Sequence, residues 1–428
     1  MSEVWLLISP MILVLLSIAL VPLLAPKFWH KSETIFFVCI LLFSVVADFL
    51  YIPTAKNILF NAIFHDYIPF IVMLFTLYVL SHGIHIKVNA TPTTLANVIF
   101  LAIGSVISSF IGTTGAAMLL IRPFIAFNET RTHKAHLLIF FIIMIANIGG
   151  LLTPLGDPPL LLGYLHGVDF TWLTTHMLKY WGGYIAICLL LLSVIDKFIL
   201  SLEHFDSSTN SHEVKISIQG VTNIVLLCLT AIILFINVDW SIKSYNIPTI
   251  YVKDAILLLL TAISLRIQNL EHQQIDFAPF VAVVKTFLVI FIVLAPVLYL
   301  MEQNVDTIHG FLHNISHEGK STPLAYFSLC SLASAFLDNA PSYLLFFHMT
   351  GQEASVLMTK YPDILTAISV SSVVMGSITY IGNAPNMMVR NIAQRRSVKM
   401  PSFVAYMGYA CLIILPTSYL LISLFNFR

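Results

Sequence analysis

Charged residues and cysteine are scarce in this sequence. Only 10% of the 428 residues are Asp, Glu, Lys or Arg, against roughly a quarter in soluble globular proteins. Lys and Arg together number 21, as do Asp and Glu, so no basic excess points to a nucleic-acid partner. The five cysteines lie far apart in apolar runs without a CxxC pair, which predicts small core residues rather than disulfides or metal ligands.

Familiar enzyme motifs are missing as well. The chain contains no P-loop, HExxH or GxSxG string, so neither ATP coupling nor hydrolase chemistry is supported. We therefore expect a protein that is not an enzyme and carries no cofactor.

Hydrophobic residues, by contrast, make up 58% of the chain. Because about 20 apolar residues span a bilayer as a helix, the sequence predicts an all-α polytopic membrane protein with about ten transmembrane helices. The expected crossings lie near residues 4–25, 34–52, 66–85, 136–165, 172–195, 217–238, 250–266, 277–300, 364–390 and 402–425.

Two apolar stretches, 95–127 and 323–347, do not fit a simple crossing. Each has a small, polar centre, GTTG at 112–115 and DNAP at 338–341. Irregular backbone at membrane depth is tolerated only where protein or a water-filled cavity surrounds it. We expect two re-entrant hairpins, the alternative being one kinked crossing helix each. Turn residues also interrupt 136–165 and 364–390, which predicts broken helices.

The two halves of the chain repeat each other. A shift of 226 residues places identical residues together at eight positions, among them Thr153 on Thr379 and Gly156 on Gly382. With both hairpins in place, five crossings separate equivalent helices, and an odd number predicts opposite orientation. We expect inverted repeats at 1–200 and 221–428, joined by a polar loop at 201–220, with broken helices meeting near the midplane. Most Lys and Arg fall on the side opposite the N-terminus, which places both termini outside the cell.

Two acids, Asp157 and Asp338, lie inside these broken apolar segments. Burial disfavours the charged form of a carboxyl group, so a buried acid can exchange a proton for a cation. The alternative is that each acid caps a half-helix. Oxygen donors suited to a hard monovalent cation cluster in the same breaks, although each donor alone could instead satisfy broken backbone. They are Thr113, Thr114, Asn147, Thr153, Asn339, Ser342, Thr379, Asn383 and Asn386.

Other polar residues are weaker candidates. Asp48 is interpreted as interfacial, near a helix end. Lys285 either extends to the membrane surface or pairs with Asp338. His133 and His136 are candidates for pH sensing, since histidine titrates near neutrality. They belong to a basic cluster that we interpret as cytoplasmic surface and that also includes Arg122, Arg131 and Lys134.

Four long strings resemble the NhaD-type sodium/proton antiporter family, within a superfamily that includes citrate and dicarboxylate carriers. They are GTTGAAMLLIRP at 112–123, NIGGLLTPLGDPPLLLG at 147–163, SAFLDNAPSYLLFF at 334–347 and TYIGNAPNMM at 379–388. The resemblance implies a homodimer in the bacterial inner membrane that exchanges cytoplasmic Na⁺ or Li⁺, bound at Asp157 and Asp338, for external H⁺.

Two other functions remain open at this stage. The first is a sodium-coupled importer of citrate, dicarboxylate or another small anion, for which Asn339, Asn383 and Asn386 would supply amide donors. The second is an intramembrane aspartyl protease, but the residues before Asp157 and Asp338 do not form the motifs that such enzymes require.

Overall fold

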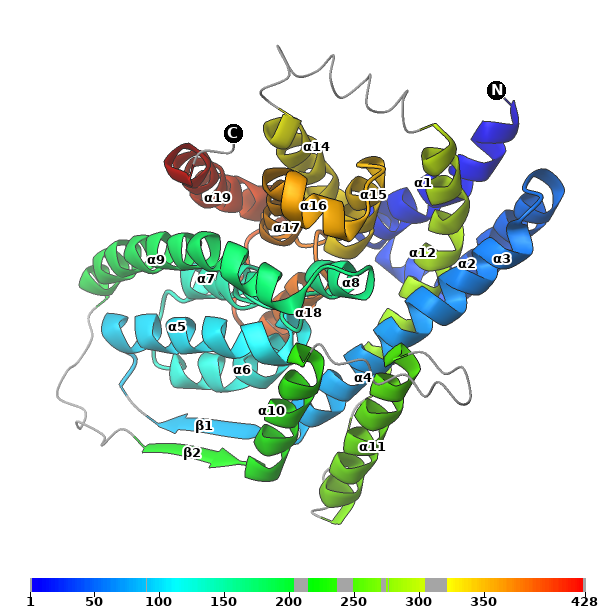
Figure 1. Ribbon diagram of the computed structural model, residues 1–428. Helices are drawn as coiled ribbons and strands as arrows, with labels where there is room; N and C mark the ends of the chain where they lie inside the picture. Colours follow the sequence, from blue (N-terminus) through cyan, green and yellow to red (C-terminus); the bar gives the residue numbers. More distant parts are fainter. Residues whose placement is uncertain are drawn as a thin grey trace.

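The computed structural model describes residues 2–89, 91–203, 215–236, 249–270, 275, 277–304 and 322–425. The described chain is helical apart from one two-stranded ribbon (Figure 1). The helices before residue 204 are α1 (Ser2–Leu24), α2 (Pro26–Tyr51), α3 (Ala55–Asn61), η1 (Ala62–Tyr67), α4 (Ile68–His82), α5 (Thr94–Ile111), α6 (Thr113–Phe127), α7 (Ala135–Met144), η2 (Ile148–Leu151), α8 (Pro158–Leu165) and α9 (Phe170–Leu202). The later helices are α10 (Val221–Phe235), α11 (Thr249–Leu270), α12 (Ala278–Gln303), α14 (Thr322–Leu337), α15 (Asn339–Met349), α16 (Ala354–Lys360), α17 (Pro362–Met375), η5 (Gly376–Ile378), α18 (Ala384–Arg395) and α19 (Phe403–Phe425).

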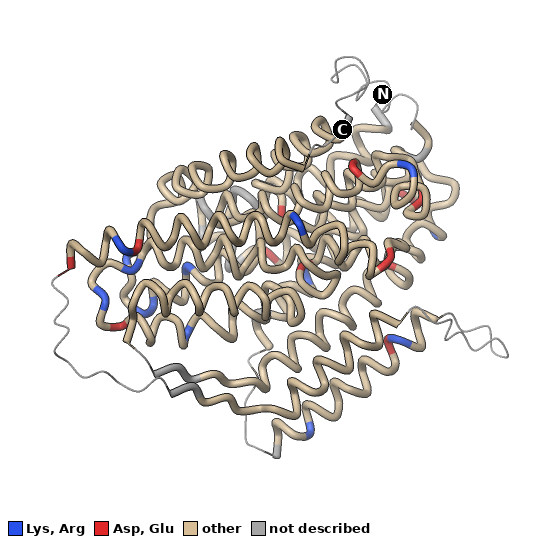
Figure 2. Tube along the Cα trace, turned by 60° about the vertical axis from the view of Figure 1, so that its left-hand side comes forward, with Lys and Arg blue, Asp and Glu red and all other residues tan. Residues whose placement is uncertain are grey.

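Long apolar helices make this a polytopic membrane protein. Within the described residues, six are long and apolar enough to cross a bilayer: Ser32–Tyr51, Ala55–His82, Thr94–Ile111, Phe170–Leu202, Phe280–Met301 and Phe403–Phe425. A bent pair, Ala354–Lys360 with Pro362–Ile378 at 109°, makes up to seven. The remaining predicted crossings fall on shorter, interrupted or more polar helices, so the total of ten stays a prediction. Figure 2 shows the charges mostly near helix ends, with long uncharged stretches between.

Both polar-centred segments double back on themselves, as the hairpin interpretation requires. Asn97 near the start of α5 and Asn128 just after α6 exchange side-chain hydrogen bonds of 3.1 and 2.8 Å. In the second segment, the Tyr326 hydroxyl of α14 donates to the Met349 carbonyl at the end of α15, at 3.4 Å. These contacts join the open ends of each helix pair, so neither pair is one kinked helix. The first arm, α5, is nevertheless long enough to qualify as a span on its own.

Two local predictions need correction. The third predicted crossing, 66–85, lies in a helix that begins at Ala55 and passes through the π-helical turn η1. Hydropathy placed its start too late because Lys56, Asn57 and Asn61 are polar, and the structure turns all three outward. The second correction is the ribbon, in which β1 (His85–Asn89) pairs antiparallel with β2 (Lys215–Gln219). These five-residue strands leave no signal in a search for membrane helices.

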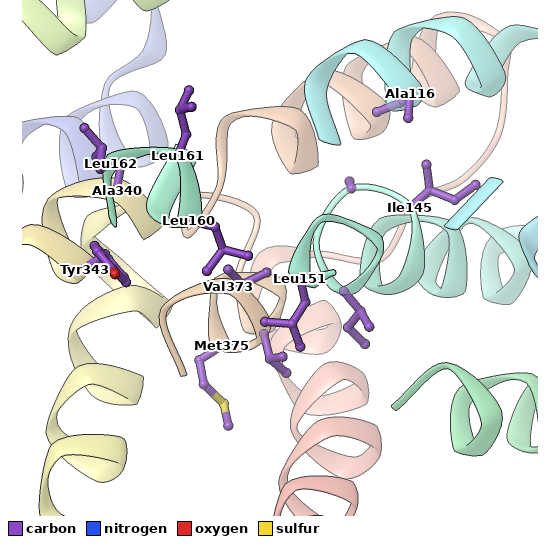
Figure 3. Close-up of a cluster of buried hydrophobic side chains, with 14 of the residues drawn as sticks. Ala116, Ile145, Leu151, Leu160, Leu161, Leu162, Ala340, Tyr343, Val373 and Met375 are labelled. Atoms are coloured by element: carbon purple, nitrogen blue, oxygen red, sulfur yellow. The ribbon is translucent and has the colours of Figure 1, made fainter. Parts of the chain in front are cut away.

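The buried apolar core surrounds the broken helices. Figure 3 shows side chains from α6, η2, α8, α15 and α17 gathered in one cluster, including Leu151, Leu160, Tyr343 and Val373. All four side chains are essentially inaccessible to solvent. The irregular backbone of 145–157 and 376–383 is therefore enclosed by protein, as irregular backbone in a membrane requires.

Candidate functional site

The two hairpin tips share one unusual backbone conformation. Gly112, between α5 and α6, has φ 82° and ψ 148°, and Asp338, between α14 and α15, has φ 86° and ψ 148°. Glycine adopts this region freely, whereas a residue with a side chain rarely does. The positions are 226 residues apart, which is the offset of the sequence repeat.

Glycines let two backbone segments touch inside each broken helix. A Cβ added at Gly156 would lie 2.3 Å from the Gly150 carbonyl oxygen, and one at Gly382 would lie 2.6 Å from that of Gly376. Proline then starts the following half-helix, because α8 and α18 both have proline in their first two positions, where its missing N–H is not needed. Each break therefore depends on glycines, which permit the close backbone contact, and on a proline that suits the start of the next half-helix.

Asp157 lies at the centre of the site and contacts both halves of the chain. The Thr113 hydroxyl donates to its Oδ1 at 2.5 Å, and the Asn339 amide donates to its Oδ2 at 2.7 Å. Asn383 adds a longer bond to Oδ1, of 3.4 Å. The side chain is buried, with 2% of the residue exposed. Three sequence-predicted donors therefore converge on one carboxyl group, from both hairpin tips and the second broken helix.

Four half-helices begin at this centre. They are α6, α8, α15 and α18, and each starts at or directly after Asp157 or one of its three hydrogen-bond donors. A helix N-terminus presents free N–H groups and a partial positive charge. The segments that precede these half-helices also end here and bring backbone carbonyl groups. The same region therefore offers N–H groups that could bind an anion and carbonyl oxygens that could bind a cation.

A second amide cluster joins the two broken helices. Asn147 donates to the Asn386 side-chain oxygen at 2.7 Å, and Asn383 donates to the Ala146 carbonyl at 3.0 Å. Asn386 in turn donates to the carbonyls of Gly376 and Thr379, at 2.8 and 2.9 Å. The predicted residues Asn147 and Asn386 thus brace the backbone of the breaks rather than contact Asp157.

Several predicted cation donors satisfy local backbone, as the alternative interpretation proposed. The Thr153 hydroxyl donates to the Ser109 carbonyl, and the equivalent Thr379 hydroxyl donates to the Ala335 carbonyl. These bonds are again related by 226 residues. Ser342 donates to the Asp338 carbonyl at 2.8 Å. Thr114 differs, since it lines a cavity beside Asp157.

The two candidate acids have different surroundings. Asp338 caps α15, with its Oδ1 accepting from the Ala340 N–H at 3.3 Å, so the capping alternative holds for this residue. Asp157 makes no such cap bond to α8, although it stands at the N-terminal position. No described hydrogen bond links the two carboxyl groups. The structure therefore singles out Asp157 as the acid with converging side-chain donors.

A small cavity lies against Asp157. It has a volume of about 50 Å³, and Thr113, Thr114, Gly156, Tyr78 and Phe280 are among its lining residues. A cavity needs about 10–15 Å³ of such space to hold a water molecule. The space therefore has room for a small cation together with water.

The weaker candidates lie apart from this centre. Lys285 is exposed and forms no ion pair with any described residue, which favours extension to the surface over pairing with Asp338. His136 Nε2 contacts Asp196 Oδ1 at 2.8 Å, whereas the His133 N–H donates to Glu203 at 2.7 Å. Their assignment to pH sensing stays a prediction.

Three interpretations of individual residues were wrong or incomplete. Arg131 is not surface, because it is buried and forms ion pairs with Asp196 and Glu203 at 2.8 and 2.9 Å. Asp48 does lie near a helix end but is only 2% exposed. Cys188 and Cys330 are core residues as predicted, whereas Cys39 and Cys228 are exposed.

Sequence reasoning missed Ser334 as part of the site. Its hydroxyl lies 3.1 Å from the Asn339 side-chain oxygen and 2.5 Å from the Ser372 carbonyl. Ser334 therefore contacts the same Asn339 amide whose N–H group donates to Asp157. The sequence does carry a signal, because Ser108 and Ser334 coincide in the 226-residue shift, but a repeated serine alone does not indicate a role in the site.

Apolar spans, broken helices and an enclosed acid are features found together in many membrane transporters. The chain belongs to the family described as "Putative citrate transport", whose model matches residues 1–427. This family indicates a secondary transporter and supports the anion importer better than sodium/proton exchange. It does not confirm the NhaD-type resemblance. No curated protein matches the chain.

Proposed function

We propose that this protein is a secondary transporter that imports a small polycarboxylate such as citrate, coupled to Na⁺ or H⁺ bound at Asp157. The observation that carries the coupling is the position of Asp157, which accepts hydrogen bonds from Thr113 and Asn339 of opposite hairpins. The family description, which spans nearly the whole chain, supports the carboxylate as substrate.

The chemistry at Asp157 suits a cation that competes with a proton. Its contact set contains neutral donors only, a threonine and two asparagines. An ionised carboxylate enclosed without a cationic partner is costly, so a bound Na⁺ or H⁺ would stabilise it. Hydroxyl and carbonyl oxygens nearby are the ligands that hard cations prefer. Occupancy of Asp157 would then favour one arrangement of the two hairpins over another.

The repeated geometry supports movement of one half against the other. The tip conformation, the glycine contact and the threonine-to-carbonyl bond all recur at the same offset. We propose that 1–200 and 221–428 are inverted repeats, and that 201–220 joins them. Their relative movement would expose Asp157 alternately to each side. In the proposed arrangement both termini face the periplasm and the protein is a homodimer in a bacterial inner membrane.

Sodium/proton exchange is the second candidate function. The neutral donor set and the small cavity favour it, since an exchanger needs no room for an organic anion beside Asp157. This candidate retains the features implied by the NhaD-type resemblance, and the family description does not support it specifically.

Transport in proteoliposomes distinguishes the two functions. Radiolabelled citrate uptake is measured with an inward Na⁺ gradient, with an inward H⁺ gradient and with neither, for wild type, Asp157→Asn and Asp254→Asn. Asp254 is a second buried acid, on α11, that shares no described hydrogen bond with the site. Gradient-driven citrate uptake that Asp157→Asn loses and Asp254→Asn keeps is the expected result.

A sodium-driven pH change without citrate uptake would instead establish the exchanger. Absence of both activities in correctly reconstituted protein would overturn both functions. Asp338→Asn provides a further comparison. Because asparagine caps a helix about as well as aspartate, we expect this variant to keep transport if capping is the role of residue 338.

A further inference from the structure

We infer that a basic pocket between α4, β1, α6 and the end of α18 is an anion-binding vestibule through which the carboxylate passes between one membrane face and Asp157. The inference deepens the proposed function and rests on it for the identity of the substrate. The pocket has a volume of about 590 Å³, far larger than the cavity beside Asp157.

One face of α6 forms a wall of the pocket. Gly115, Met118, Leu119 and Arg122 all line it, and their spacing of three, four and seven residues places them in one stripe along the helix. From Thr113 at the centre to Arg122 the helix rises about 13 Å, at 1.5 Å per residue. The stripe thus leads from the acid contact to the basic residue.

The end of α18 brings a second arginine to the same pocket. This half-helix also begins at the centre, directly after Asn383, and Arg396 follows its last residue. Helices α6 and α18 pack against each other. Two half-helices that touch Asp157 at one end therefore carry guanidinium groups to the pocket at their other end.

The pocket and the cavity beside Asp157 share a boundary. Tyr78 and Gly115 line both of them. Gly115 lies where α6 closely approaches α4, since an added Cβ would lie 2.9 Å from the Ser81 hydroxyl oxygen. A larger side chain at this position would obstruct the junction between the two spaces.

The charge of the pocket matches a polycarboxylate. Arg122 and Arg396 are exposed, and neither forms an ion pair with a described residue. Its lining also includes His82 and His85 but no Asp or Glu. A planar guanidinium binds a carboxylate through two parallel hydrogen bonds. A cation would be repelled here, so the pocket favours an anionic substrate over a pathway for Na⁺ alone.

Binding of citrate to the full-length protein in phosphatidylcholine nanodiscs, at fixed Na⁺ concentration, tests the vestibule. Isothermal calorimetry is run on wild type, Arg122→Gln, Arg396→Gln and, as a matched control, Arg266→Gln on α11. Arg266 is exposed and is not among the residues that line the pocket. We expect each vestibule variant to weaken citrate binding about two- to fivefold, as for one exposed charge pair, and Arg266→Gln to bind as wild type does.

If both vestibule variants bind citrate as tightly as wild type does, the inference is overturned. The proposed function still stands in that case, provided that wild type shows gradient-driven citrate uptake. Absence of citrate binding by wild type, together with sodium-driven proton exchange, would overturn both. A phospholipid phosphate is the other anion of similar chemistry. Nanodiscs containing phosphatidylglycerol separate the two, because arginine-dependent lipid binding without citrate binding would also overturn the inference.

Gly115→Leu tests the junction. It is expected to lose citrate uptake, and a cooperative thermal unfolding transition of the same preparation shows that the protein is folded. Uptake equal to that of wild type would show that the carboxylate does not pass this point and would overturn the proposed route.

Discussion

Substitution of Gly156 by alanine tests whether backbone contact inside the break holds the site together. The added Cβ would lie 2.3 Å from the Gly150 carbonyl oxygen, and the two nearest further atoms, at 2.7 Å, also belong to the Gly150 backbone. No flexible side chain can move aside, so the backbone of one segment must shift by about an ångström. Overpacking of this kind destabilises proteins by about 1–3 kcal/mol.

The same shift disturbs the acid. The Gly156 carbonyl accepts from the Thr113 N–H at 2.7 Å, and Thr113 holds Asp157 Oδ1. We therefore expect Gly156→Ala to lower both thermal stability and coupled transport. The effect on melting temperature should be no more than about 2–4 °C per kcal/mol, the value for smaller domains.

Two other glycines provide matched controls for the same chemical change. A Cβ at Gly182 of α9 or Gly408 of α19 meets no atom within 4 Å. Because alanine favours a helix over glycine by up to about 1 kcal/mol, Gly408→Ala and Gly182→Ala should be neutral or slightly stabilising. Thermal unfolding by intrinsic fluorescence, with transport measured on the same preparations, gives both readouts. A Gly156→Ala variant as stable and active as Gly408→Ala would refute the reasoning.

Three further changes test individual contacts. Thr113→Val removes the hydroxyl that donates to Asp157, so we expect cation affinity in a transport assay to change about tenfold, with Thr113→Ser close to wild type. Arg131→Met removes the arginine partner of the buried Asp196 carboxylate and leaves it only the His136 contact, so we expect destabilisation of about 3–5 kcal/mol, seen as loss of monodisperse protein. The double change with Asp196→Leu should recover much of that loss. Asp169→Ala removes the cap of α9 and should cost about 1 kcal/mol in thermal unfolding. Partial burial acts to raise the pKa of Asp169, but hydrogen bonds from Thr171 and Trp172 outweigh burial and lower the pKa. The stability that the Asp169 carboxylate contributes is therefore complete above about pH 4 and is lost only as the pH falls further. An equal effect of the variant at pH 7 and in strong acid would contradict this.

The breaks and their acid could be predicted from the sequence because they conflict with their surroundings. Gly150, Pro158 and Asp157 have no place in a lipid-facing helix, and the second copy repeats the conflict at the same spacing. The structure encloses these residues and joins Asp157 to Asn383, the pair that the repeat aligned. Local chemistry that opposes hydropathy therefore pointed to residues that the structure brings together.

Roles that depend on distant partners could not be predicted. Arg131 looked like surface because it lies in the loop between α6 and α7, and its partner Asp196 is 65 residues away in α9. Asp338 and Asp157 looked equivalent, since composition does not show that one caps its own helix while the other receives bonds from both hairpins. The start of α3 was missed because hydropathy averages over faces, whereas its polar residues all lie on the exposed side.

The backbone at Asp338 bears on the balance between conformations of the transporter. With φ 86° and ψ 148°, this aspartate occupies a region that glycine fills at the equivalent tip and that costs other residues about 1–3 kcal/mol. This strain raises the free energy of the conformation described here relative to any conformation in which the backbone of residue 338 adopts a more favourable φ and ψ. Since 1.4 kcal/mol is a factor of ten in population, glycine at this position would favour the present state by roughly five- to 140-fold. An aspartate at the second tip thus keeps the alternative conformation within reach.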